Sequence, residues 1–360
     1  MADKSSIEWT RGEDGTAGAT WNPIVGCSIV SPGCTNCYAM KMAARIEAMH
    51  EGTHRPHVLA GGNPAPRSHY EGTTADSKAG AVWTGKVELA PEHILTKPLR
   101  WRRGRRIFVN SMGDLFHESV PDEWIDRVFA VMALCPQHTF QVLTKRSARM
   151  REYCERLDSE PVSDTVRRIV AAWPGNAPIP HEIVFPLPNV WNGVSAEDQR
   201  RADERREDLA ALASAGWRTF VSYEPALGAV DWSGWEFLSW LISGGESGPH
   251  ARPSHPDWHR AARDFCAVHG IPYFFKQWGA WAPQLGAITL NDNPEQSRYR
   301  WAEWTDWCAS YFRWVYIDRP QWCEDMDPDH SMIHVGKRVA GRLLDGQEHN
   351  GMPGGREVVR

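Results

Sequence analysis

The segment TWNPIVGCSIVSPGCTNCY, residues 20–38, decides how this chain is interpreted, because it places three cysteines between two regular elements. Cys27, Cys34 and Cys37 fall within eleven residues, next to a Pro-Gly turn that lets three thiols of one loop face a common centre. Apolar and β-branched residues precede the loop, and residues 38–50, rich in Ala, Met, Lys and Arg, follow it. The pattern predicts a strand, a thiol-bearing loop and a helix.

Three clustered thiolates are soft ligands, suited to zinc or to an iron–sulfur cluster. No second Cys-x-x-Cys occurs downstream, which excludes the zinc ribbon built from two such pairs. Three cysteines can hold a four-iron cluster by three irons and leave the fourth iron open to a ligand. The alternative is a closed Cys3His zinc site, completed by His50, His54 or His57. Reactive or disulfide-forming thiols would need a partner that the sequence does not identify.

Composition bounds the class of protein. The chain has 360 residues, 42% hydrophobic and 24% charged, as a globular protein does. Neither a signal peptide nor an apolar run of membrane-spanning length is recognisable, so we expect no membrane contact and, with eight cysteines, a reducing cytoplasm. The net charge of −5 provides no overall attraction to nucleic acid, so such binding would need a local basic patch. For the five cysteines outside the loop we expect buried core positions.

Strand-like and helix-like segments alternate after residue 85. Strands are predicted at 86–90, 106–111, 139–145, 190–195, 218–223, 238–243 and 271–276, with helices at 91–102, 121–134, 200–213 and 256–269 and one ending at 157. This alternation predicts an α/β fold, a TIM-like (β/α) barrel of six to eight units, full or partial, over residues 1–280. Residues 51–85 are expected to be a long loop or lid, and residues 281–360 an irregular, Trp-rich C-terminal extension.

A parallel barrel carries its chemistry at the carboxyl ends of its strands. Helix capping explains part of the polar character there, but cations are unfavourable at a helix amino terminus, so capping does not explain two of the lysines. The candidate catalytic residues at the mouth of the pocket are Asp114, Lys145, Glu224 and Lys276.

These motifs together resemble the radical S-adenosylmethionine (SAM) superfamily and, more closely, the phage-associated three-Cys-motif family. Beside the cysteines, the matching stretches are TWNP at 20–23, NSMGDLFH at 110–117, SYEP at 222–225, GGESG at 244–248, FFKQWG at 274–279 and AGRLLDG at 340–346. Two features depart from the superfamily. Its usual spacing is Cys-x3-Cys-x2-Cys, whereas six residues separate the first two cysteines here, and the Gly-Gly-Glu turn follows about the seventh strand rather than the second.

The resemblance implies that Cys27, Cys34 and Cys37 hold a [4Fe–4S] cluster whose open iron is chelated by S-adenosyl-L-methionine. The reduced cluster would cleave SAM to a 5′-deoxyadenosyl radical, which acts on an unidentified substrate. An external reductant is implied, and a partner protein is a further expectation. The residues expected to contact SAM are Tyr38, Gly244, Gly245 and Glu246.

Residues 97–106, KPLRWRRGRR, carry six positive charges and one tryptophan. They suit either a solvated helix end, where cations complement the dipole, or contact with a phosphate backbone. The candidate contacts are Arg100, Arg102, Arg103, Arg105 and Arg106. A nucleic-acid base or nucleotide is therefore the first expectation for the substrate, in phage DNA modification or repair within the host cytoplasm. The alternative function is a structural zinc protein that binds nucleic acid without catalysis.

Overall fold

The computed structural model describes residues 4–5, 7–12, 15–53, 68–78, 80–159, 183, 185–283, 300–305, 313–317 and 331–354. The chain divides into two compact units, one of residues 1–194 and 207–219, the other of residues 195–206 and 220–360. Each polar cluster considered below lies within one unit. Among the described residues, no helix has the length and apolar character that crossing a lipid bilayer requires.

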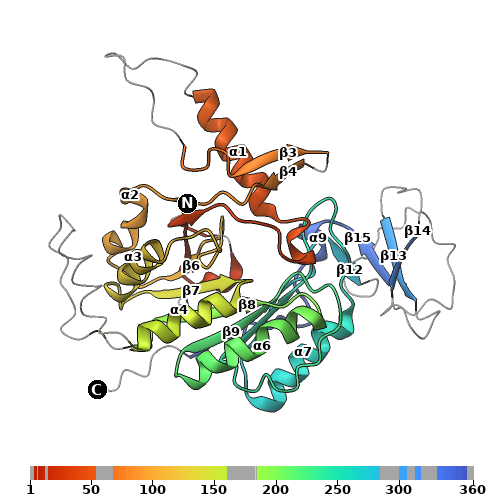
Figure 1. Ribbon diagram of the computed structural model, residues 1–360. Coiled ribbons are helices and arrows are strands. Elements are labelled where there is room, and N and C mark those ends of the chain that lie inside the picture. Colours follow the sequence, from red (N-terminus) through yellow and green to blue (C-terminus); the bar gives the residue numbers. More distant parts are fainter. Residues whose placement is uncertain are drawn as a thin grey trace. The chain divides into compact units, whose positions relative to one another are not determined.

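A seven-stranded sheet confirms the expected α/β class (Figure 1). Its strands are β1 (Ala19–Trp21), β6 (Arg106–Val109), β7 (Thr139–Thr144), β8 (Val190–Ser195), β9 (Arg218–Tyr223), β10 (Trp240–Gly244) and β11 (Tyr273–Gln277), in that order across the sheet. The pairs from β1 to β8 and those from β9 to β11 are parallel. Spatial order follows chain order, as in a (β/α) barrel and unlike a doubly wound sheet, so the sheet is compatible with a partial barrel.

The first unit is built on strands buried on both faces. All six residues of β8 are buried, which explains why such strands lack hydrophobic alternation. The helices α3 (Asp122–Ala133) and α4 (Ser147–Ser159) follow β6 and β7 as expected. They pack on β8 and the turn before it: Asn189 Nδ2 donates to the carbonyl oxygen of Met132 at 3.0 Å, and Asn192 Nδ2 donates to Cys154 Sγ at 3.7 Å.

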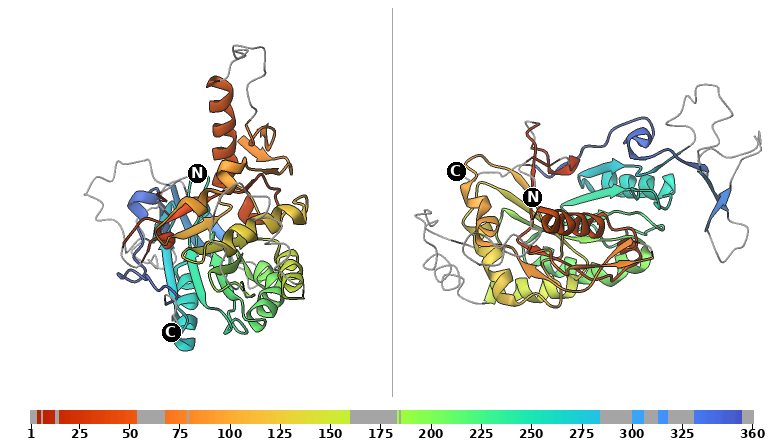
Figure 2. Two further views of the ribbon diagram at one scale, coloured as in Figure 1. Left: turned by 90° about the vertical axis from the view of Figure 1, so that its left-hand side faces the viewer. Right: turned by 90° about the horizontal axis from the view of Figure 1, so that it is seen from above.

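The thiol loop joins β1 to α1 (Tyr38–Thr53), which confirms the predicted order of strand, loop and helix. Within it, β2 (Ile24–Val25) pairs antiparallel with β5 (Glu88–Leu89), and η2 (Pro32–Cys34) forms a single turn. Beside α1 lies a hairpin of β3 (Thr74–Ser77) and β4 (Gly80–Trp83), as Figures 1 and 2 both show. The buried side chains of Ala39, Met40, Ala43, Tyr70 and Trp83 form the core between them.

Three local predictions were wrong, the third of them in part. Residues 86–90 are not a barrel strand, because β5 has only two residues and its partner is β2 rather than the main sheet. The helix expected over residues 91–102 divides into α2 (Glu92–Leu95) and η3 (Lys97–Arg100), since Pro98 lacks the N–H that an α-helix requires. The hairpin of β3 and β4 also replaces part of the loop expected at 51–85, whereas residues 54–67 lie outside the described residues.

In the second unit, α7 (Pro256–His269) connects β10 to β11 and has the predicted bounds. His255 caps it by accepting from the N–H of Asp257 at 3.2 Å, and Gly270 ends it in the left-handed conformation, with φ of +67°. Trp258, Ala262 and Cys266 form its buried face. The bounds of α6 (Gln199–Ser214), which precedes β9, also match the prediction to within one residue.

The parallel alternation ends after β11. A four-stranded antiparallel sheet follows, of β12 (Trp281–Pro283), β13 (Arg300–Thr305), β14 (Arg313–Ile317) and β15 (Ser331–His334), and then the short helix α9 (Lys337–Ala340). The chain then returns to β11, where the N–H of Phe275 donates to the carbonyl oxygen of His349 at 2.9 Å. Trp307 and Trp322 lie outside the described residues, and the division of the chain at residue 280 stays a prediction.

Candidate functional site

Two glycines that pack backbone against backbone anchor the thiol loop. Gly26 has φ of +89°, and a Cβ there would lie 2.0 Å from the carbonyl oxygen of Lys86. A Cβ at Gly113, just after β6, would lie 2.9 Å from the carbonyl oxygen of Gly26. The N–H of Gly26 also donates to the carbonyl oxygen of Met112 at 3.1 Å. The loop therefore starts directly beside the carboxyl end of β6, in an arrangement that only glycine allows.

Cys37 lies at the amino end of α1. Burial raises the pKa of its thiol, while hydrogen bonds from the backbone N–H groups of Ala39 and Met40 and the charge of Lys145 act in the opposite direction. The thiol is thus protonated on its own, and the same donors would stabilise the thiolate that a metal requires. Cys34, in η2, is buried, with its sulfur 3.7 Å from Ser31 Oγ.

The donor set of the loop decides which group it could hold. In the described part of the chain, no three His, Cys, Asp or Glu side chains gather as the ligands of one metal ion do. A four-iron cluster is several atoms wide, so its three thiolates lie farther apart than the ligands of one ion. Three free thiols on one loop are the soft ligands that an iron–sulfur cluster held by three cysteines would use.

The Cys3His alternative depends on where α1 carries its histidines. His50 lies twelve residues beyond Tyr38 in this helix, which corresponds to about 18 Å along the axis. The helix therefore carries His50 away from Cys37, which lies at its other end. The other two candidates, His54 and His57, lie outside the described residues.

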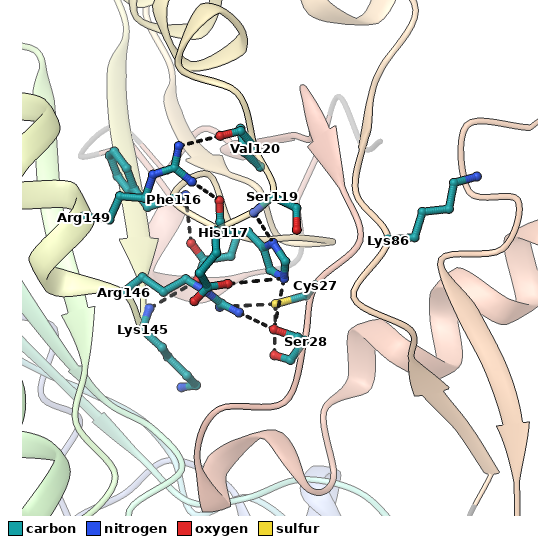
Figure 3. A network of polar contacts seen from close by, with 12 residues as sticks. Cys27, Ser28, Lys86, Phe116, His117, Ser119, Val120, Lys145, Arg146 and Arg149 are labelled. Atoms are coloured by element: carbon teal, nitrogen blue, oxygen red, sulfur yellow. Dashed lines mark hydrogen bonds and ion pairs between the residues drawn. The ribbon is translucent and has the colours of Figure 1, made fainter.

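A buried guanidinium links the loop to the ends of β6 and β7 (Figure 3). Arg146 is the second residue after β7, and its side chain is only 6% exposed. Its Nη1 donates to Cys27 Sγ at 3.5 Å and to Asp114 Oδ2 at 3.0 Å, its Nη2 donates to Ser28 Oγ at 2.7 Å, and its Nε donates to Glu118 Oε1 at 3.0 Å. One cation thus contacts two carboxylates, a hydroxyl and a thiol.

Asp114 aligns this cation. Its Oδ1 accepts from Thr144 Oγ1 at 2.7 Å and from the N–H of Phe116 at 3.0 Å, and its Oδ2 accepts from the N–H of Lys145 at 3.2 Å as well as from Arg146. The carboxylate therefore fastens the loop after β6 to the end of β7. Both the acid and the arginine are buried, so removing either partner would leave an uncompensated buried charge.

Cys27 and His117 both respond to this buried environment. Burial raises the pKa of Cys27 to about 12, with the charge of Asp114 adding to the rise and Arg146 opposing it. Burial and the charge of Arg146 lower the pKa of His117. His117 Nδ1 accepts from the N–H of Ser119 at 3.1 Å, so the proton of the neutral ring is assigned to Nε2, which lies 3.0 Å from Ser28 Oγ.

The structure brings Asp114 and Lys145, two of the four expected catalytic residues, next to the thiol loop. Tyr38 is 58% exposed, its hydroxyl donates to the carbonyl oxygen of Ser111 at 3.1 Å, and its contact with SAM stays a prediction. Arg146 was not among the expected site residues, although it shares the signal that singled out Lys145, a cation at the start of a helix. Ser28, His117 and Glu118 were also missed.

The other two expected catalytic residues form an ion pair in the second unit. Lys276, on β11, places its Nζ 2.7 Å and 2.8 Å from the two carboxylate oxygens of Glu224, which follows β9. Their side chains are 16% and 19% exposed. Each charge therefore already has its partner, and a catalytic role for either residue stays a prediction.

The Gly-Gly-Glu turn, also in the second unit, packs against its own chain. A Cβ at Gly245 would lie 2.1 Å from the carbonyl oxygen of Trp278, so close packing explains this glycine. The Glu246 carboxylate accepts from the N–H, Nε and Nη2 of Arg252 at 2.8, 2.9 and 2.6 Å. A Cβ at Gly244 would be in ordinary contact with Glu224. The expected contact of this turn with SAM stays a prediction.

The basic segment lies at the amino end of β6, whereas Asp114 follows the carboxyl end of the same strand. Arg105 stacks its guanidinium 4.8 Å from the ring centroid of Trp101, and Arg106 donates to the carbonyl oxygen of Arg11. Arg100, Arg102 and Arg103 are exposed. The segment is therefore at the opposite end of the strand from the thiol loop, and its contact with nucleic acid stays a prediction.

Comparison with known proteins assigns the family. Residues 4–353 match the model of the family described as "Protein of unknown function (DUF5131)". The chain belongs to this family. No curated protein matches the chain. Among solved structures, a mutant of spore photoproduct lyase with bound AdoMet and dinucleoside spore photoproduct is similar, with 10% sequence identity and a TM-score of 0.35, over 83% of this chain and 68% of that one. The expected phage association stays a prediction.

Proposed function

We propose that this DUF5131 protein is an iron–sulfur enzyme of the radical-SAM type, with Cys27, Cys34 and Cys37 as the ligands of a [4Fe–4S] cluster. The observation that carries the proposal is the environment of the three thiols. They lie on one loop beside the carboxyl end of β6, and two of their sulfurs accept hydrogen bonds, Cys27 from Arg146 and Cys37 from backbone N–H groups.

The position of His50, at the other end of α1 from Cys37, favours this cluster over a zinc site closed by that histidine. Structural zinc sites are closed by four protein ligands, whereas a cluster held by three cysteines keeps one iron open for a small molecule. When bound and reduced, such a cluster supplies the electron that breaks a carbon–sulfur bond of SAM. The chain's own part is to hold the thiolates with the donors named above and to place the charge of Lys145 near Cys37.

For the substrate, we propose a nucleic-acid base or a nucleotide. The support is the exposure of Arg100, Arg102 and Arg103 in the basic segment. Because this segment lies at the far end of β6 from the loop, it would bind the phosphate backbone of the nucleic acid rather than the reacting base.

The proposal is tested by anaerobic purification followed by reconstitution with iron and sulfide. We expect about four irons and four sulfides per chain, a broad absorption that dithionite bleaches, and formation of 5′-deoxyadenosine from SAM. One tightly held zinc per chain without sulfide would refute the cluster and leave the alternative, a structural zinc protein that binds nucleic acid.

A further inference from the structure

We propose that Arg146 sets the reduction potential of the cluster, by donating a hydrogen bond and lending its positive charge to the sulfur of Cys27. The proposal rests on the proposed function, because it requires that Cys27 is a cluster ligand. Arg146 would act on the cluster through Cys27 rather than by direct contact. Asp114, of opposite charge, would shift the reduction potential in the opposite direction.

The geometry of the guanidinium is the first support. Nη1 lies 3.5 Å from Cys27 Sγ, within the range of hydrogen bonds to sulfur, and the same nitrogen lies 3.0 Å from Asp114 Oδ2. Nη2 is held by Ser28 Oγ at 2.7 Å. Figure 3 shows the guanidinium extending from the end of β7 to the residues of the loop. With its planar fork fixed by these contacts, Arg146 keeps one N–H directed at the sulfur.

Burial makes the charge effective. The side chains of Arg146 and Asp114 are 6% and 7% exposed, so water screens them little, whereas Glu118 is 64% exposed and is screened more strongly. Reduction adds one negative charge to a cluster. A cation and a hydrogen bond at a ligand sulfur stabilise that added charge, and a nearby carboxylate destabilises it. Arg146 and Asp114 therefore shift the potential in opposite directions.

Other donors to the loop sulfurs differ from Arg146. The N–H groups that reach Cys37 belong to the backbone of α1, and Ser31 beside Cys34 is neutral. Arg149 provides a matched control, because it lies on the next turn of the same segment. It donates to the carbonyl oxygens of His117 and Val120 and pairs with Asp122 at 2.9 Å, and within the described residues none of its hydrogen bonds goes to a thiol.

The experiment is a spectroelectrochemical titration of the reconstituted full chain, with iron and sulfide measured on the same samples. We expect R146M to lower the equilibrium constant of cluster reduction about tenfold, a shift of about 59 mV towards more negative potential for one electron. R146K, which keeps the charge but loses the fork, should shift the potential less. D114N should shift it in the positive direction, and R149M should leave it unchanged.

The outcomes separate this inference from the proposed function. If the wild-type chain holds no iron and sulfide, the proposed function fails and the inference fails with it. If the wild type holds the cluster but R146M and R149M have the same potential, the inference alone is overturned. If R146M does not retain its iron, the potential of D114N becomes the test. A shift of the D114N potential in the negative direction would contradict the opposing roles of Arg146 and Asp114.

Discussion

The polar clusters at the strand ends of the two units differ in what their charges face. In the first unit, Arg146 divides its donors among two carboxylates, a hydroxyl and the thiol of Cys27. In the second unit, Lys276 donates to both carboxylate oxygens of Glu224, and Arg252 donates to both carboxylate oxygens of Glu246. In these ion pairs of the second unit, each charge is balanced by a partner within the protein. In the first unit a buried cation also reaches a thiol, and it is there that we propose the cluster-binding loop.

The largest effect that this comparison predicts is on cluster binding. C34A should reduce iron and sulfide per reconstituted chain to background, because two remaining thiols cannot hold the cluster. Far-ultraviolet circular dichroism should be unchanged, since Cys34 lies in a single turn outside the sheet. C266A, which alters a buried thiol of α7, is the control and should bind iron fully. Loss of folding in C34A would instead identify the loop as a structural knuckle.

A second prediction compares the two ion pairs by stability. R146M leaves Asp114 buried without its cation, which should cost about 3–5 kcal/mol of unfolding free energy. K276M should cost about 2 kcal/mol, because water reaches the 19% exposed Glu224. Urea unfolding of the apoprotein measures both. Equal losses in the two variants would show that the pairs are buried alike and that the comparison is wrong.

The third prediction concerns a neutral, buried group of the second unit. His259 lies between Ser243 and Ser254, and burial, together with the nearby His255, lowers its pKa from 6.5 to about 3. Because the unfolded chain takes up this proton at higher pH than the folded chain, stability should fall as pH drops from 6.5 towards 3, by at most about 1.4 kcal/mol per pH unit.

The test of this pH dependence is the urea midpoint measured between pH 7 and pH 4.5. H259Q removes the titrating group and should flatten the curve, whereas H269Q, at the exposed end of α7, should leave it as in the wild type. If the curve of H259Q is as steep as that of the wild type, acid acts elsewhere, with the buried His117 of the first unit as the next group to change.

Local signals were sufficient for much of the fold. The bounds of β8, β9 and α7 agree with prediction, because an apolar run or a capped amphipathic pattern is contained within each segment. The prediction of a main-sheet strand at 86–90 was wrong because the pairing partner of these residues is distant in the sequence. Residues 88–89 pair with β2 in a separate two-stranded sheet, and no pattern within 86–90 indicates that partner.

That three thiols lie on one loop between a strand and a helix could be predicted from the residues alone, because their spacing and the flanking patterns are local. The parallel order of the strands could be predicted in the same way. Which side chains face those thiols is visible only in the folded chain. Asp114 follows β6 and Arg146 follows β7, and they meet beside Cys27 because parallel strands bring their carboxyl ends together. Such a meeting depends on the register of three strands, which no single segment encodes.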